Sequence, residues 1–177
     1  MTCIVGVAHA GRVWIGGDSA GVSGWSLAIR ADEKVFANGP FVMGFTSSFR
    51  MGQLLRYSFV PPEKDPQSDI DRYMSTSFVD AVRRCLKDGG FALKKEEREE
   101  GGTFIVGIAG SLFLVEDDYQ VGRQTCGYVA AGCGGDVALG SLYATKSLDP
   151  EHRVMLALES AEAHSAGVRG PFVVRHT

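Results

Sequence analysis

Thr2 combines a nucleophile and a base if the mature chain begins at this residue. It follows Met1, and threonine is small enough for an aminopeptidase to remove the methionine before it. The hydroxyl of an N-terminal threonine can attack a carbonyl carbon while its own α-amine accepts the hydroxyl proton. An α-amine has a reference pKa of about 7.7–8.0, so part of it is neutral near pH 7 and can act as a base. The first hypothesis is a hydrolase with an N-terminal threonine nucleophile, and Cys3 is the runner-up nucleophile.

Other motifs that carry chemistry are absent from the sequence. The four cysteines, at positions 3, 85, 126 and 133, form no CxxC pair and have no histidine at zinc-ligand spacing, so we expect no metal site. There is no GxSxG, Walker or HExxH motif, and we expect no cofactor. The segment Gly132-Cys133-Gly134-Gly135 lacks the P-loop lysine and is more typical of a tight turn that opens a helix than of a phosphate site.

Length and composition bound the class of protein. The chain has 177 residues, of which 45% are hydrophobic and 22% charged, which is typical of one globular domain over residues 1–177. The formal net charge of -3 argues against a nucleic-acid partner, because phosphate binding requires a basic surface. The sequence has no basic leader and no apolar run of about 18 residues, so we expect a cytoplasmic protein with reduced cysteines and no membrane partner.

Hydrophobic patterns predict strands, two helices, strands, two helices and a final strand. The strands are expected at 4–8, 13–16, 25–29, 34–36, 41–46, 103–109, 112–115, 128–131 and 172–174. The helices are expected at 51–59, 68–88, 136–145 and from Pro150 onward, with Asp149 as the N-cap of the last. The charge run at 94–100 is expected to be a solvated loop.

These elements must bury two apolar sets of strands. The strands at 4–8 and 13–16 are apolar throughout, which indicates that both of their faces are covered. Hairpins supply antiparallel pairing, and each set of strands needs a helical cover. We therefore expect an α+β fold, a four-layer αββα sandwich of two mainly antiparallel sheets with helices outside, and no linker or internal repeat that divides the chain.

The order of residues in the first quarter of the chain resembles proteasome β subunits and the bacterial peptidase HslV. Those families open with a Thr-x-x-Val-Gly strand, followed by an Asp that ends the second strand, a Lys about fifteen residues later and a Gly at the end of a buried strand. The matching segments here are Thr2-Cys3-Ile4-Val5-Gly6-Val7, Gly16-Gly17-Asp18-Ser19, Lys34 and Met43-Gly44, and further likeness covers 101–108 and 128–135. The resemblance implies the N-terminal nucleophile (Ntn) hydrolase fold.

The resemblance also implies a role for each matching residue. Thr2 would be the nucleophile, and Lys34, held by Asp18, would lie close to the Thr2 hydroxyl. The backbone N–H of Gly44 would donate to the oxyanion. Cys133 stands where the family has a serine that contacts the threonine amine. A family Asp-Ser-x-Ser-Gly stretch is best matched by residues 164–167, which contain no acid; His164 or a shifted alignment would then account for that position.

The function implied is a threonine-type peptidase that cleaves polypeptides within a homo-oligomeric ring, with an AAA+ unfoldase as a further partner. One alternative is a self-assembling shell or scaffold that has lost turnover, which Cys133 and the missing acid favour. Another is an Ntn amidase that acts on a small substrate. The presence of Thr2, Asp18 and Lys34 favours catalysis.

Overall fold

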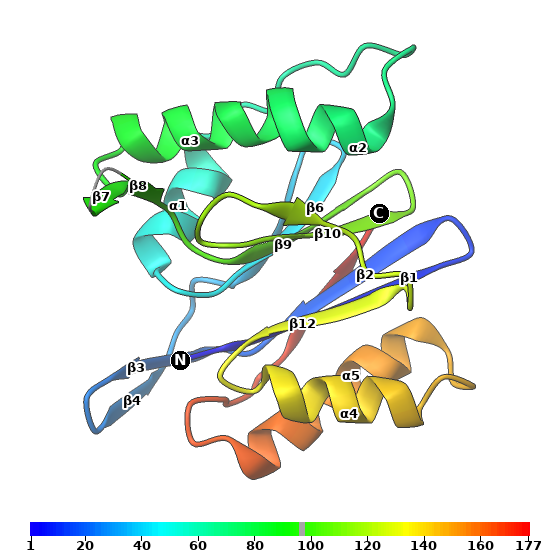
Figure 1. The fold of residues 1–177 in the computed structure, drawn as a ribbon. Helices are drawn as coiled ribbons and strands as arrows, with labels where there is room; N and C mark the ends of the chain where they lie inside the picture. The colour runs from blue at the N-terminus through cyan, green and yellow to red at the C-terminus, as the bar shows by residue number, and fades with distance from the viewer. Residues whose placement is uncertain (96–97) are drawn as a thin grey trace.

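Two antiparallel sheets lie face to face between two layers of helices (Figure 1). The computed structural model describes residues 1–95 and 98–177. The first sheet has the strand order β12-β1-β2-β13 and contains β1 (Cys3–His9), β2 (Arg12–Gly17), β12 (Tyr128–Gly132) and β13 (Val173–His176). The second has the order β11-β10-β9-β6-β5 and contains β5 (Val35–Asn38), β6 (Phe41–Phe45), β9 (Phe104–Ile108), β10 (Ser111–Val115) and β11 (Val121–Gly122).

Helices cover the outer face of each sheet. The second sheet is covered by α1 (Phe49–Tyr57), α2 (Ile70–Tyr73), the π-helical turn η1 (Met74–Phe78) and α3 (Val79–Asp88). The first is covered by α4 (Gly135–Ala144) and α5 (Pro150–His164). Asp149 caps α5 as expected, because its carboxylate accepts a hydrogen bond from the His152 N–H at 3.0 Å. The architecture is the expected αββα sandwich. No helix in the described residues is long and apolar enough to cross a membrane.

The uniform apolarity of β1 follows from burial on both of its faces. Cys3, Val5 and Val7 pack in the cluster formed with α4 and α5. Ile4 points the other way, into the cluster between the two sheets. Successive side chains of a strand alternate between its faces, so a strand covered on both sides needs apolar residues at every position.

Three segments differ from the expected elements. One strand was expected at 25–29, whereas β3 (Ala20–Ser23) and β4 (Ser26–Ile29) form a hairpin. The expected helix at 68–88 is divided by η1. The charge run does not form a simple loop, because β7 (Leu93–Lys95) and β8 (Arg98–Glu100) pair with each other, while its residues 96–97 lie outside the described part. An ion pair of 2.7 Å between Arg83 and Glu99 joins β8 to α3.

Gly44 allows the two sheets to approach each other, which gives a test of the packing. A Cβ atom at this position would lie 2.6 Å from Ile4 Cγ2 and 2.9 Å from Ile15 Cγ2. Gly44→Ala should therefore destabilise the protein by about 1–3 kcal/mol in urea unfolding, because the added methyl group overpacks the core.

The matched control is Gly140→Ala in α4, where an added Cβ would meet nothing within 4 Å. This change should stabilise the protein by about 0.5–1 kcal/mol, because alanine has the higher helix propensity. Equal unfolding midpoints for the two variants would contradict the packing described for β6.

Candidate active site

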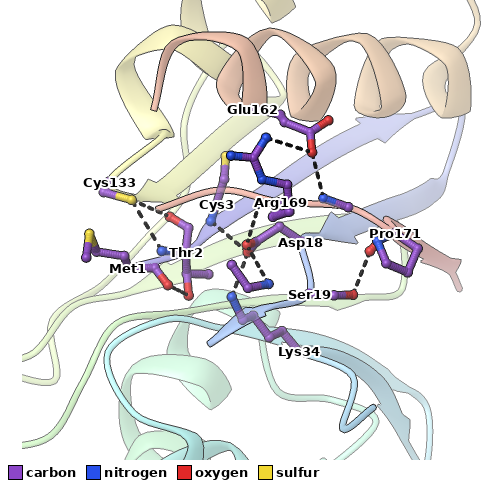
Figure 2. A network of polar contacts seen from close by, with 12 residues as sticks. Met1, Thr2, Cys3, Asp18, Ser19, Lys34, Cys133, Glu162, Arg169 and Pro171 are labelled. Carbon is purple, nitrogen blue, oxygen red and sulfur yellow. Dashed lines mark hydrogen bonds and ion pairs between the residues drawn. The ribbon is translucent and has the colours of Figure 1, made fainter. Parts of the chain in front are cut away.

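Thr2 is held where β1 begins, beside the end of β12 (Figure 2). Its N–H donates to Cys133 Sγ at 3.3 Å, and its hydroxyl donates to the Met1 carbonyl at 2.5 Å. The side chain is almost buried, with 5% of the residue exposed. Gly132 has a φ of 96°, and a Cβ atom there would lie 2.2 Å from the Thr2 carbonyl oxygen. Only glycine permits this close approach, which brings the next residue, Cys133, to the threonine.

Asp18 directly follows β2, and its carboxylate connects four segments of the chain. Because Gly17 pairs with Ile4, the following carboxylate lies beside the start of β1. Its Oδ1 accepts hydrogen bonds from Lys34 Nζ at 2.7 Å and from the Cys3 N–H at 3.0 Å. Its Oδ2 accepts from the N–H groups of Ala20 at 3.0 Å and Arg169 at 3.3 Å. The Cys3 contact positions the residue that directly follows Thr2.

Lys34 is a fully buried cation next to this carboxylate. Only 1% of Lys34 and 2% of Asp18 are exposed. Burial lowers the pKa of the Lys34 ammonium below its ordinary value of 10.5, and the negative charge and hydrogen bond of Asp18 act in the opposite direction. Within the described residues Lys34 Nζ donates only to Asp18, so two of its three N–H donors are left for groups that enter the site. Figure 2 shows Lys34, Asp18 and Thr2 together.

Cys3 is unsuited to act as the nucleophile. Burial, followed by the negative charge of Asp18, raises the pKa of the Cys3 thiol from 9.0 to about 12. Its side chain packs on the opposite face of β1, against the cluster with α4 and α5. A thiol that stays protonated in an apolar core does not attack a carbonyl carbon.

The ladder of β6 does not allow the oxyanion role expected for Gly44. The Thr46 N–H donates to the Thr103 carbonyl at 3.0 Å, on the side of β9. N–H groups two residues apart in a strand point to the same side, so the Gly44 N–H also faces β9, where Gly44 pairs with Ile105. The expectation was wrong because sequence spacing does not define which neighbouring strand an N–H faces.

Ser47, the second residue after β6, is the better placed donor. It has a φ of 60° and lines a pocket together with Thr2. Its hydroxyl accepts from the Thr103 N–H at 3.1 Å. In the part of the chain that the structure describes, its own N–H has no hydrogen-bond partner. The sequence signal for Ser47 would have been the end of the apolar strand, followed by three polar residues, at 46–48.

The pocket beside Thr2 is small and carries no charged side chain. Its volume is about 70 Å³, and Met1 forms part of its wall. The remaining lining residues come from β3, the end of β6 and the start of α1: Val22, Phe45, Thr46, Ser47, Ser48 and Phe49. It can therefore receive an uncharged group next to the Thr2 hydroxyl.

The acidic side chain that contacts the C-terminal segment near the site belongs to Glu162 of α5, and not to residues 164–167. Glu162 accepts a hydrogen bond from the Gly170 N–H at 2.9 Å and lies 3.7 Å from the Arg169 guanidinium. Ser165 donates its hydroxyl to the Cys133 carbonyl at 3.5 Å. His164 ends α5 and is exposed. Sequence reasoning missed Glu162 because it lies outside the matched stretch, on the preceding helix.

The structure thus brings Thr2, Asp18, Lys34 and Cys133 together and leaves Gly44 in the sheet. Among the described residues, no group of three or more His, Cys, Asp or Glu side chains is arranged to hold a metal ion.

Solved structures share this fold over almost the whole chain. BPH from Thiobacillus denitrificans in complex with epoxomicin is 21% identical, with a TM-score of 0.83 over 99% of this chain and 97% of that chain. A second structure of Thiobacillus denitrificans BPH is 20% identical, with a TM-score of 0.80 over the same shares of the two chains. Eukaryotic HslV from Trypanosoma brucei is 19% identical, with a TM-score of 0.70 over 98% of each chain. No protein-family model and no curated protein sequence matches the chain. The HslV/proteasome type of fold is confirmed.

The buried ion pair can be tested by a double-mutant cycle on stability. Asp18→Asn leaves the Lys34 ammonium buried without its counter-charge, so it should cost roughly 3–5 kcal/mol in urea unfolding. Lys34→Met keeps an unbranched apolar stem but leaves the carboxylate without its cation. The double variant should lose less than the sum of the two single losses, because it contains no unpaired buried charge. Additive losses would show that the two side chains are not coupled.

Proposed function

We propose that this chain is a threonine-type peptidase whose nucleophile is Thr2, exposed by removal of Met1. The observation that carries the proposal is the buried Asp18–Lys34 pair next to Thr2. Burial of two charges is costly, and an apolar pair would serve the fold at least as well. A cation with free N–H donors beside an N-terminal hydroxyl has a catalytic use, and this explains its burial.

The reaction proceeds through an acyl-enzyme. The α-amine of mature Thr2 accepts the proton of Oγ1, and Oγ1 attacks the carbonyl carbon of the substrate. Lys34 stabilises the negative charge on Oγ1, and the Ser47 N–H donates to the oxyanion. When the C–N bond breaks, the α-ammonium returns the proton to the leaving amine. The amine then takes a proton from water, which attacks the ester and releases Thr2.

The substrate binds as an extended strand. The Arg30 N–H donates to the Ser19 carbonyl at 2.8 Å, so alternate residues from Ser19 onward face β4. The N–H and C=O of Val22 face the other way, at the free edge of β3, and Val22 lines the pocket with Thr2. Main-chain hydrogen bonds to such an edge hold a peptide with little dependence on its sequence.

Assembly into a homo-oligomeric ring is part of the proposal. Leu139 and Tyr143 of α4, and Leu148 after it, are exposed apolar residues of the helix layer that covers the first sheet. Contacts between copies of the chain would cover them. An AAA+ unfoldase partner and a cytoplasmic location stay predictions.

Two other functions share this fold. An inactive shell is favoured by Cys133, a weaker hydrogen-bonding group than serine, and by the absence of an acid in 164–167. An amidase for a small substrate is favoured by the pocket of about 70 Å³. Hydrolysis of a panel of small amides and of peptides, measured side by side, separates these from the peptidase.

Thr2→Ala should abolish hydrolysis of fluorogenic peptides and labelling of the protein by epoxomicin, while assembly measured by size-exclusion chromatography is retained. The native protein should show an intact mass lower by one Met residue, because a blocked α-amine cannot accept the proton. The matched variant is Cys3→Ala, which should keep activity. Loss of activity in Cys3→Ala but not in Thr2→Ala, or retention of Met1 on every active chain, would contradict Thr2 as the nucleophile.

Lys34→Ala should lower kcat by about 10²–10³-fold, because the charge that stabilises Oγ1 is removed. Lys34→Arg should also be impaired, since a planar guanidinium does not fit the position of an ammonium. In the wild type, kcat should fall as the pH rises through the Lys34 pKa, and burial places this fall below pH 10.5. The unfolding midpoint of each variant is the control, because it shows whether lost activity reflects lost folding. If folded Lys34→Ala keeps the wild-type kcat, Lys34 has a structural role only.

A further inference from the structure

Glu162 contacts the segment that follows α5, close to the candidate active site (Figure 2). It lies in the last turn of α5, where the helix dipole disfavours a negative charge, so helix stability does not account for a glutamate at this position. Its side chain is 30% exposed and therefore adds little to the core. The hydrogen bond that it accepts from outside the helix explains its position better.

Glu162 and Ser19 hold the same peptide unit from opposite sides. The Gly170 N–H donates to Glu162 Oε1 at 2.9 Å. The Arg169 carbonyl, in the same peptide unit, accepts from the Ser19 N–H at 2.8 Å. The N–H and the C=O of a planar trans peptide unit point in opposite directions. The two hydrogen bonds together therefore fix the orientation of the peptide plane between Arg169 and Gly170.

The orientation of that peptide plane controls a hydrogen bond to Asp18. The Arg169 N–H donates to Asp18 Oδ2 at 3.3 Å, which is the longest of the four hydrogen bonds described for this carboxylate. An N–H donor usually lies about 2.7–3.2 Å from its oxygen, so a small displacement of the backbone breaks this contact. Oδ1 of the same carboxylate binds Lys34 Nζ at 2.7 Å, so a carboxylate that turns toward its remaining donors displaces the ammonium.

We infer that Glu162 is a positioning residue of the candidate active site. Its carboxylate fixes the peptide unit after Arg169 and thereby keeps the Arg169 N–H on Asp18, which in turn holds the Lys34 ammonium. The inference rests on the proposed function, because its effect on turnover requires Lys34 to act on the Thr2 hydroxyl. A misplacement of about 1 Å that starts far from the reacting atoms can lower a rate by about 10²-fold.

The acceptor oxygen of Glu162, rather than its charge, has this role. Its contact with the Arg169 guanidinium is 3.7 Å long and joins two partly exposed side chains, and such an ion pair contributes little. A glutamine has the same length and keeps a carbonyl oxygen that can accept from the Gly170 N–H, whereas an alanine has no acceptor. The two substitutions therefore separate the hydrogen bond from the ion pair.

The test compares Glu162→Ala and Glu162→Gln by the kcat of each Thr2 site that epoxomicin labels. Glu162→Ala should lower this kcat about tenfold and change KM by less than about twofold, because Lys34 is displaced while the peptide-binding strand is not. Glu162→Gln should stay within about threefold of the wild type. The matched control is Glu159→Ala, which removes an exposed carboxylate from the same shallow surface pocket and should leave both constants unchanged.

A second measurement does not need turnover. Hydrogen exchange of the Arg169 N–H, resolved to this residue by mass spectrometry with fragmentation, should be about tenfold faster in Glu162→Ala and unchanged in Glu162→Gln. Both variants should fold, because the side chain is partly exposed, and urea unfolding checks this. A merely structural role of Glu162 would reduce the number of labelled sites and leave the kcat of each site unchanged.

Three results would overturn the inference: a wild-type kcat per labelled site in Glu162→Ala, equal losses of kcat in Glu162→Ala and Glu162→Gln, or unaltered exchange at Arg169 in Glu162→Ala. If the wild-type protein cleaves no peptide while the exchange pattern holds, the peptidase proposal fails and the positioning of Asp18 by Glu162 stands.

Discussion

The Asp18 carboxylate, buried beside the Lys34 ammonium, is the contact on which the position of the N-terminal residue depends. It accepts hydrogen bonds from the neighbouring Ala20 and from Cys3, Lys34 and Arg169, which belong to three other segments of the chain. A buried carboxylate is tolerated only when its oxygens are fully hydrogen-bonded, so the charge forces these segments to meet. Since Cys3 is one of the donors, the same requirement fixes the backbone of the residue that directly follows Thr2.

Much of this arrangement could be predicted from the sequence, because it depends on short-range spacing. In the hairpin of β1 and β2, Gly17 pairs with Ile4, so Asp18 lies beside the start of β1. This placement follows from the local pairing of the two strands. The apolar runs at 4–8 and 13–16 predicted sheets that are covered on both faces, and the structure buries both. The roles of Thr2, Lys34 and Cys133 came from the resemblance to known families and stay predictions, while the structure shows a contact of Thr2 with Cys133 and one of Lys34 with Asp18.

The features that the sequence did not predict depend on longer-range geometry. Whether the Gly44 N–H faces β9 or the pocket is decided by the pairing of β6 with its neighbours, which spacing along one strand does not define. Glu162 reaches the segment near Arg169 only because α5 packs back on the first sheet. The strand β3 was missed because Gly21, Ser23 and Gly24 interrupt its apolar pattern.

The hydrogen bond from the Arg169 N–H to Asp18 has a consequence for the order of events during synthesis. Residue 169 is synthesised 151 residues after Asp18. The Asp18 carboxylate therefore lacks one of its donors until the segment around Arg169 has emerged, and the first sheet lacks β13 for at least as long. The start of β1, which Asp18 holds through the Cys3 N–H, is therefore fixed in its final position only after that long stretch of chain has been made.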